Sequence, residues 1–422
     1  MSAAAATRLR VPGDKSISHR ALICGALASG RSRVRNILLS ADVQSTAGVL
    51  RALGTPIPQL SDDLRIDGRG LGGLTPPTVH LDCGNSGTTA RLMTGVLSAC
   101  RFDSRLVGDA SLSRRPMGRV ARPLGSMGAH FTFDEGEHLP MVIRGGALHA
   151  IQYVSPTASA QVKSAILLAG LVGRVPVSVS EPARSRDHTE RMLASLGVDV
   201  RSVGAEASLE PAGEIAPFQL DVPADPSSAA FFAGLAAAGG AGGASLLLTD
   251  VALNPTRLGF FRVLRDMGAD VTWTVEREEC GEPVGTITVR PGELTAVRVG
   301  EEQVPAMIDE LPLLACLGTI ASGETEIRGA AELRVKESDR ITAVVENLRA
   351  IGADAEELKD GLIVRGRRGA LGGHVRTHGD HRLAMAFGVL GVLSGGTITV
   401  DDPECVSVSY PGFWKDLARA AS

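Results

Sequence analysis

Six runs of small and apolar residues along the chain each follow a short polar residue. A serine or aspartate in that place accepts hydrogen bonds from the free N–H groups of a helix start, and the apolar run predicts a buried helix. The six polar residues recur at intervals of 68 to 82 positions: Ser16, Ser86, Ser159, Ser227, Asp309 and Asp380. Such a period predicts an internal repeat.

A second pattern, chosen independently of the first, has the same period. Five segments with apolar residues at helical spacing end in a glycine, a common helix stop: Gly54, Gly128, Gly197, Gly268 and Gly352. Both series contain one long step, and its extra residues fall in the acidic stretch Glu276–Glu282, which predicts a lengthened hairpin. Alternating segments such as 78–82 and 218–222 predict strands. The sequence thus predicts six mixed α/β repeats of helix, strand, helix and further strands.

The repeat count also predicts how the chain is divided. The sixth repeat stops near residue 421, and the one unassigned strand pattern is Thr7–Val11, so we expect the N-terminal strand to complete that repeat. This predicts a discontinuous lobe, 1–14 plus 228–422 (repeats 4–6), and a continuous lobe, 15–227 (repeats 1–3), with connections near Asp14 and Asp225. Two lobes with an active-site cleft between them are favoured over an open solenoid.

Composition then excludes several classes of function. The chain has 43 lysines and arginines against 47 aspartates and glutamates, and so lacks the basic excess that nucleic acid or a membrane surface would require. The six cysteines lie far apart without a CxxC pair, which favours reduced cytosolic thiols over a zinc site. Glycines interrupt the uncharged stretches Pro226–Thr249 and Leu383–Val400, and the N-terminus lacks the apolar core of a signal peptide. We expect a cytoplasmic protein with no metal, nucleic-acid or membrane partner.

Cations gather at the predicted helix starts, where free backbone N–H groups also attract anions. Taken singly, each is typical of a solvated surface, but their recurrence at equivalent repeat positions predicts a site for two small, highly anionic molecules. Glycine and hydroxyl residues accompany them at 85–88 and 159–161. The cations are Lys15, Arg20, Arg114, Arg115, Lys336, Arg340 and Arg382.

Carboxylates form the other half of the candidate chemistry. Asp309 and Glu310 interrupt the apolar run 304–317, where an unpaired charge would be costly. Glu337 and Asp339 lie between two of the cations, an arrangement typical both of structural ion pairs and of catalytic acids. His381 follows Asp380 and would either cap a helix or donate to a phosphate.

Eight segments together closely resemble the enolpyruvyl transferases, and among them the 5-enolpyruvylshikimate-3-phosphate (EPSP) synthase family. The resemblance covers essentially the whole chain. The segments are PGDKSISHRALI (12–23), GNSGTTARL (84–92), RRPMGR (114–119), SAQVKSAILLAGL (159–171), SRDHTERML (185–193), MIDELP (307–312), RVKESDR (334–340) and GDHRLAM (379–385). It implies the two-lobed inside-out α/β barrel of that class, with six βαβαββ repeats, three per lobe, and substrates bound in the cleft on closure.

The resemblance also implies the reaction. The enolpyruvyl group of phosphoenolpyruvate would pass to the 5-hydroxyl of shikimate 3-phosphate through a tetrahedral intermediate, with release of phosphate, in the shikimate pathway to chorismate and the aromatic amino acids. One carbon is protonated and then deprotonated, which requires positioned acid and base groups and no cofactor. The family further implies a monomer.

Residue roles follow from the same motifs. Asp309 matches the base that accepts the 5-hydroxyl proton, and Glu337 matches the group that exchanges protons at C3 of phosphoenolpyruvate, with Lys15 as a second candidate. The implied shikimate 3-phosphate contacts are Lys15, Ser16, Arg20, Ser159, Ala160, Gln161, Arg186, Asp309 and Lys336. The implied phosphoenolpyruvate contacts are Lys15, Asn85, Gly87, Thr88, Arg115, Gln161, Arg340, His381 and Arg382.

Some positions depart from the best-known bacterial pattern. The stretch 405–411, CVSVSYP, lacks a lysine that often contacts phosphoenolpyruvate, and Ala160 replaces a second serine. Leu92 replaces a proline, and Glu332 replaces an asparagine associated with the shikimate ligand. Gly87 implies sensitivity to glyphosate, an anionic competitor of phosphoenolpyruvate, whereas the missing lysine argues against it.

Two alternative functions, one in a related enzyme family and one in a different class, fit the sequence less well. UDP-N-acetylglucosamine enolpyruvyl transferases share the fold, but their first motif has Lys-Asn in place of Lys-Ser, and they carry a cysteine in a loop. This chain has Lys15-Ser16 and no cysteine between Cys100 and Cys280. A non-catalytic repeat scaffold or nucleic-acid clamp would spread its cations along one face, whereas here they cluster at helix starts among hydroxyls and acids.

Overall fold

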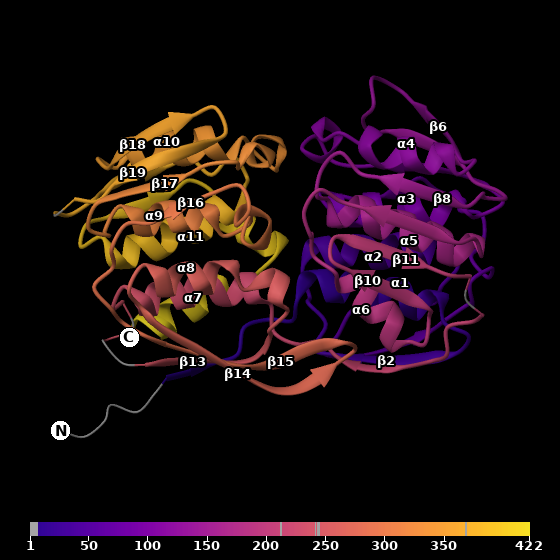
Figure 1. The fold of residues 1–422 in the computed structure, drawn as a ribbon, viewed down its shortest axis with the longest axis horizontal. Helices are drawn as coiled ribbons and strands as arrows, with labels where there is room; N and C mark the ends of the chain where they lie inside the picture. Colours follow the sequence, from indigo (N-terminus) through magenta and orange to yellow (C-terminus); the bar gives the residue numbers. More distant parts are fainter. Residues whose placement is uncertain (1–6, 212, 241, 243–244, 368) are drawn as a thin grey trace. The chain divides into compact units, whose positions relative to one another are not determined.

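The computed structural model describes residues 7–211, 213–240, 242, 245–367 and 369–422, which divide into two compact units (Figure 1). Unit 1 comprises the segment that ends at Pro12, Pro223–Arg277 and Pro283–Ser422. Unit 2 comprises Gly13–Val222 and the short stretch Glu278–Glu282. The predicted lobe boundaries, 14/15 and 227/228, lie two and five residues from the observed ones at 12/13 and 222/223.

Unit 2 contains three repeats. Its elements are α1 (Lys15–Leu27), β2 (Arg31–Arg35), α2 (Ala41–Ala52), β3 (Asp63–Asp67), β4 (Leu81–Asp82), α3 (Gly87–Ser98), β5 (Asp103–Val107), η1 (Leu112–Arg114), α4 (Gly118–Ser126), β6 (His130–Phe133), β7 (Met141–Arg144), β8 (Ile151–Val154), α5 (Ala160–Gly173), β9 (Val177–Ser180), α6 (His188–Ser195), β10 (Val200–Val203), β11 (Glu206–Leu209) and β12 (Gln219–Asp221).

Unit 1 contains the other three repeats and the N-terminal strand. Its elements are β1 (Thr7–Leu9), α7 (Pro226–Ala237), β13 (Leu246–Ala252), η2 (Pro255–Arg257), α8 (Gly259–Asp266), β14 (Asp270–Glu279), β15 (Glu282–Arg290), β16 (Arg298–Val299), η3 (Val304–Ala306), α9 (Leu311–Gly318), β17 (Glu324–Ile327), η4 (Ala331–Val335), α10 (Arg340–Ala350), β18 (Asp354–Leu358), β19 (Gly361–Arg365), β20 (Gly373–Val375), α11 (His381–Leu393), β21 (Ile398–Val400), η5 (Pro403–Val408) and α12 (Phe413–Ala421).

Repeats 2, 3 and 5 each form one sheet by the same rule. The strand before the first helix pairs in parallel with the strand after it, as β4 does with β5, β8 with β9 and β16 with β17. An antiparallel hairpin then completes a four-stranded sheet, as in the order β4-β5-β7-β6. The predicted βαβαββ repeat is therefore present, in full in four sheets and shortened in the first and last repeats.

The first helices of the repeats form the centre of each unit. In unit 1, α7, α9 and α11 pack against one another, and in unit 2 α3 packs against α1 and α5. Helices α5 and α7 are apolar nearly all round, as a helix surrounded by protein must be. Their small residues allow close approach: a Cβ on Gly95 of α3 would lie 2.2 Å from the carbonyl oxygen of Ala165 in α5.

The two uncharged stretches belong to this helical centre. Each begins in a buried helix, α7 or α11, that is followed by a strand, β13 or β21, as expected. Within the described residues no helix combines the length and apolarity needed to cross a bilayer.

The predicted helix caps are right at three places and displaced at three. Ser86, Ser159 and Asp380 cap α3, α5 and α11, and their side chains accept from the backbone N–H groups of Thr89, Val162 and Arg382. At α1 and α7 the caps are instead Asp14 and Asp225, two residues earlier, because an aspartate there reaches the same free N–H groups. Helix α9 begins at Leu311 after Glu310, so Asp309 is left outside it.

The expectation for the N-terminal strand is wrong in one respect. Strand β1 joins the sheet of the fourth repeat, where Thr7 pairs with Leu246 of β13, and not the sheet of the sixth. Strand β12, which precedes α7, pairs in turn with β2 of the first repeat. Repeats 1 and 4 have thus exchanged their first strands, and the sixth repeat has its own, β20.

The lengthened hairpin predicted at 276–282 is present as β14 and β15. Its tip, Glu278–Glu282, belongs to unit 2, although the rest of both strands belongs to unit 1. The buried side chains of Glu282 and His188 meet there at 2.7 Å, and Arg191 donates to the carbonyl oxygen of Gly281 at 2.8 Å. The chain therefore passes between the units four times, whereas the sequence predicted two connections.

Candidate substrate-binding site

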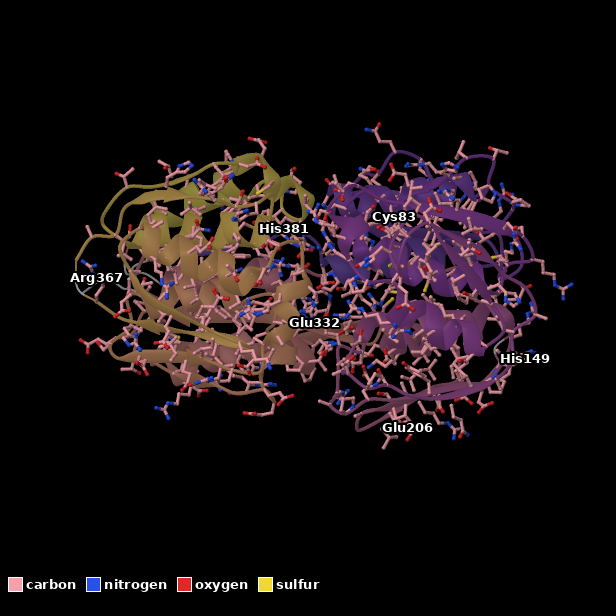
Figure 2. The ribbon with its side chains drawn as sticks, turned by 90° about the horizontal axis from the view of Figure 1, so that it is seen from above. Cys83, His149, Glu206, Glu332, Arg367 and His381 are labelled. Carbon is pink, nitrogen blue, oxygen red and sulfur yellow. The ribbon has the colours of Figure 1, made fainter. Side chains whose placement is uncertain are left out.

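The predicted site residues divide into two sets, one in each unit, which are called the unit 2 cluster and the unit 1 cluster. The unit 2 cluster consists of Lys15, Ser16, Arg20, Asn85, Gly87, Thr88, Arg115, Ser159, Ala160, Gln161 and Arg186. The unit 1 cluster consists of Asp309, Lys336, Glu337, Arg340, His381 and Arg382. His381 and Glu332 can be located in Figure 2.

Helix α1 presents two cations of the unit 2 cluster. Asp14 caps the helix by accepting from the N–H of Ile17 at 2.8 Å. The Lys15 ammonium lies 2.9 Å from Asp42 of α2, and its side chain keeps 20% of its surface exposed. Lys15 is therefore oriented by a carboxylate and still accessible to a second anion.

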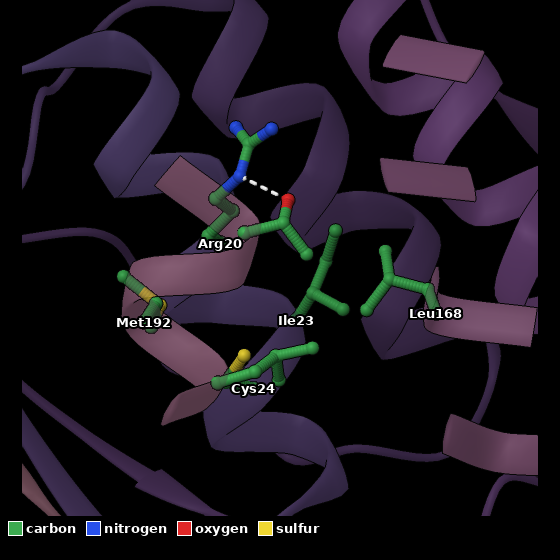
Figure 3. A pocket seen from close by; sticks show the side chains of 7 residues that line it. Arg20, Ile23, Cys24, Leu168 and Met192 are labelled. Carbon is green, nitrogen blue, oxygen red and sulfur yellow. Dashed lines mark hydrogen bonds between the residues drawn. The ribbon is translucent and has the colours of Figure 1, made fainter. Parts of the chain in front are cut away.

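Arg20 is buried one turn further along the helix. Its Nε donates to Thr189 Oγ1 at 2.7 Å, Nη2 to Ser164 Oγ at 2.8 Å and Nη1 to the carbonyl oxygen of Ser16 at 2.9 Å. Figure 3 shows the apolar pocket beside it, lined by Ile23, Cys24, Leu168 and Met192 among others. Burial lowers the pKa of Arg20, and Glu190 opposes that shift. A guanidinium held in this way is fixed in one orientation.

Two arginines converge on the start of helix α3. A Cβ on Gly87 would lie 2.8 Å from Arg91 Nη1 and 3.4 Å from Arg115 Nη1, so the glycine allows the close approach of Arg91 beside Arg115. Arg115 also donates to the side-chain and main-chain oxygens of Asn85. Two guanidinium groups beside free helix N–H groups make an anion-binding site.

Gln161, at the start of α5, connects that site to its neighbour. It accepts from Arg91 Nη1 at 2.7 Å and donates to Thr88 Oγ1 at 3.2 Å. Ser159 caps the same helix, and its own N–H donates to Glu181 Oε1 at 2.6 Å. The starts of α3 and α5 are thus joined by side chains.

The unit 1 cluster is organised around Arg340, which is 1% exposed. It donates to Asp380 at 2.8 and 3.1 Å, to Glu337 at 2.6 Å and to Asp309 at 3.4 Å. Burial alone would lower the pKa of Arg340, but Asp380 and Glu337 raise it above its ordinary value. Both predicted acid/base residues are therefore fixed on one guanidinium.

The other two cations of this cluster lack such partners. Among the described residues, no carboxylate lies within ion-pair distance of Lys336 or Arg382. Arg382 is only 5% exposed, and its guanidinium carbon lies 5.9 Å from the centre of the Phe231 ring. Burial lowers the pKa of Lys336, as does Arg340, while Asp309 opposes the shift. A buried arginine and a half-buried lysine, neither within ion-pair distance of a described carboxylate, are suited to bind anions.

Some contributing residues were missed or misread in the sequence. Arg91 lies four residues after Gly87, on the same face of α3, and this spacing was the available signal. Asp380 was assigned only as a helix cap, although it also pairs with Arg340. Asp42 and Thr189 are distant in sequence from the cations they hold, so no local pattern could have identified them.

The repeat architecture and the clustered anion-binding cations are those expected of the enolpyruvyl transferase class. A sequence model described as EPSP synthase (3-phosphoshikimate 1-carboxyvinyltransferase) matches residues 2–417. The chain therefore belongs to the EPSP synthase family.

Similar proteins extend this result. A 3-phosphoshikimate 1-carboxyvinyltransferase of a Sulfurihydrogenibium species is 49% identical over 98% of this chain and 96% of its own length. One from Aquifex aeolicus is 48% identical, with coverage of 97% and 96%. A solved EPSP synthase of Acinetobacter baumannii superposes with a TM-score of 0.86 at 43% identity, covering 98% of this chain and 95% of that one.

Family membership confirms several predictions made from the sequence. The α/β fold class, the assignment as a transferase and the resemblance itself are confirmed. So is the activity, transfer of the enolpyruvyl group of phosphoenolpyruvate to shikimate 3-phosphate in the shikimate pathway. The alternative acceptor, UDP-N-acetylglucosamine, is set aside because the matching family is the other one.

Proposed function

We propose that the two clusters act on one pair of substrates, with the residues of both units contributing to a single reaction. The observation that carries this proposal is the pair of buried or half-buried cations, Arg382 and Lys336, that lack a carboxylate partner in the described part of unit 1. Both substrates carry a phosphate ester and a carboxylate. Several fixed cations are needed to bind them.

Shikimate 3-phosphate is bound chiefly by the unit 2 cluster. Lys15, Ser16 and Arg20 of α1 hold it, and the start of α5 and Arg186 contact its phosphate. The α5 contacts come from Ser159, Gln161 and the main chain of Ala160. Lys336 and Asp309 are its contacts from unit 1.

Phosphoenolpyruvate is bound by arginines from both units. The start of α3 contributes Arg115 with Asn85, Gly87 and Thr88, and Lys15 and Gln161 reach it from α1 and α5. Arg340, Arg382 and His381 complete the set from unit 1. The geometry at Gly87 supports this assignment, because a Cβ there would displace the Arg91 guanidinium and contact that of Arg115.

The acid/base steps fall to two carboxylates fixed by Arg340. Asp309 accepts the proton of the 5-hydroxyl while the hydroxyl oxygen attacks C2 of phosphoenolpyruvate, and a proton is added to C3. Glu337 transfers the protons to and from C3, with Lys15 as the second candidate for this role. C3 then loses a proton as phosphate leaves, so the product is the enolpyruvyl ether and no cofactor is consumed.

We further infer that the chain acts as a monomer in a reducing cytoplasm. All six cysteines are free, and five of them are buried, which suits such a compartment. A sedimentation mass equal to one chain, unchanged by substrates, would support the monomer, and a mass of two chains would contradict it.

A phosphate-release assay in which each substrate is omitted in turn tests the proposal. Phosphate should appear only when shikimate 3-phosphate and phosphoenolpyruvate are both present. Release from phosphoenolpyruvate alone, or equal release with UDP-N-acetylglucosamine as acceptor, would overturn it.

Arg382→Gln should raise KM for phosphoenolpyruvate, and an unchanged KM would remove Arg382 from the site.

A further inference from the structure

Three buried charges in unit 2 have no place in the reaction as described above. Lys163 of α5 lies 2.8 Å from Glu181 and 2.9 Å from Glu190 of α6. The side chains of Lys163, Glu181 and Glu190 are 4%, 0% and 3% exposed. Burying such a triad is costly in free energy, and a plain hydrophobic contact would often be as stable. Stability alone therefore does not explain the triad.

Glu181 differs from Glu190 in what else it binds. Its Oε1 accepts from the backbone N–H of Ser159 at 2.6 Å, and its Oε2 accepts from Ser185 Oγ at 2.7 Å. Ser159 begins α5, and Ser185 immediately precedes Arg186. One carboxylate thus ties together two segments that each carry an expected contact to the phosphate of shikimate 3-phosphate.

Arg20, another expected contact of shikimate 3-phosphate, belongs to the same assembly. Arg20 donates to Ser164 and Thr189, which are the neighbours in sequence of Lys163 and Glu190, and these two hydroxyls lie 2.7 Å apart. The assembly then contains two cations and two carboxylates, so its formal charge is zero. The carboxylates consequently do not present a net negative charge to an incoming phosphate.

We propose that Glu181, paired with Lys163, is a positioning residue for the phosphate of shikimate 3-phosphate. It fixes the start of α5 and the segment before α6 relative to each other, so that Ser159 and Arg186 are in place before the ligand binds. Binding to preformed groups avoids the entropy lost in ordering two loops. This inference rests on the proposed function, which assigns Ser159 and Arg186 to that phosphate.

Glu181→Gln is the sharpest test. A glutamine has one acceptor oxygen, so its NH2 group must face either the Ser159 N–H or the Lys163 ammonium, both of which are donors. The Ser159 and Ser185 segments should then lose their fixed relation. We expect KM for shikimate 3-phosphate to rise about tenfold, the effect typical of losing a charge-assisted hydrogen bond. KM for phosphoenolpyruvate and kcat should change less than twofold.

Glu190→Gln is the matched control. It removes the same charge from the same ammonium group at equal burial, but the described contacts of Glu190 do not include Ser159 or Ser185. It should lower the melting temperature by a similar amount while KM for shikimate 3-phosphate stays within twofold. Ser185→Ala, which removes only one hydroxyl, should raise that KM several-fold and serves if Glu181→Gln does not fold.

The outcomes separate the inference from the proposed function. Equal increases of KM in Glu181→Gln and Glu190→Gln would show a merely structural role and overturn the inference. So would unchanged KM values in Glu181→Gln, or in Ser185→Ala if that variant is used. Failure of the wild-type protein to bind shikimate 3-phosphate would instead overturn the proposed function.

Discussion

At the residue scale, Arg340 determines how the acid/base chemistry should respond to mutation. Asp309 and Glu337 both accept hydrogen bonds from it, so one guanidinium positions both carboxylates. We expect Asp309→Ala and Glu337→Gln each to lower kcat by about a hundredfold or more, the usual effect of removing a general acid or base. Titration calorimetry should still detect binding of shikimate 3-phosphate. Normal turnover in either variant would exclude that residue from the mechanism.

Gly87 allows a second test with an internal control. A methyl group there would lie 2.8 Å from Arg91 Nη1, so Gly87→Ala should push that guanidinium aside and raise KM for phosphoenolpyruvate about tenfold or more. KM for shikimate 3-phosphate should change little. Gly48→Ala in α2 is the control, because nothing lies within 4 Å of its Cβ position, and it should leave both KM values unchanged. Equal KM values for wild type and Gly87→Ala would contradict the crowding argument.

His19 gives the protein a pH dependence that can be measured. Burial lowers the pKa of His19 well below its ordinary value, and Lys15 and Arg20 add to the effect. The unfolded chain therefore binds a proton that the folded protein does not, and stability is lost as the pH falls below about 6.5. Urea unfolding between pH 7 and pH 5 should show a smaller loss for His19→Gln than for the wild type. Identical pH slopes would mean that His19 remains protonated in the fold.

At the scale of elements, the period of the hydrophobic pattern was enough to predict the repeats but not how their strands pair. The starts of α3 and α5 were found because a capping serine precedes an apolar run at the repeat spacing. The exchange of β1 and β12 was not, because both strands precede a repeat's first helix in the same way, and only tertiary packing decides which sheet each one joins. Glu181 and Asp42 were missed for a similar reason, since their partners are remote in sequence.

Asp380 combines a helix cap with an ion pair, and two substitutions separate these roles. It accepts from the N–H of Arg382 at the start of α11 and from Arg340. Both Asp380→Ala and Asp380→Ser leave Arg340 short of a buried partner, at a cost of about 3–5 kcal/mol. Serine can still cap the helix, so Asp380→Ser should be about 1 kcal/mol more stable to urea unfolding than Asp380→Ala. Equal stabilities would show that the cap contributes nothing.

At the scale of the whole molecule, the exchange of first strands and the β14–β15 hairpin interleave the two units along the chain. Strand β1 pairs within unit 1 and strand β12 within unit 2, so each unit is completed by a strand whose neighbour in sequence lies in the other. Neither unit is a contiguous stretch of chain. A fragment of residues 15–222 would retain β12 but would lack the hairpin tip, which contacts His188 and Arg191.

The hairpin tip provides the test at this scale. Glu282 is buried against His188, and the Glu279 side chain accepts from the N–H of Asp221, so residues 278–282 are held by unit 2. The body of β15 pairs with β13 in unit 1. Glu282→Ala should free the tip, so that hydrogen exchange at the amides of 278–282 becomes much faster, while the amides of 287–289 keep their protection. Uniformly faster exchange along both strands would mean instead that the hairpin folds as one cooperative piece and that the tip is not separately anchored.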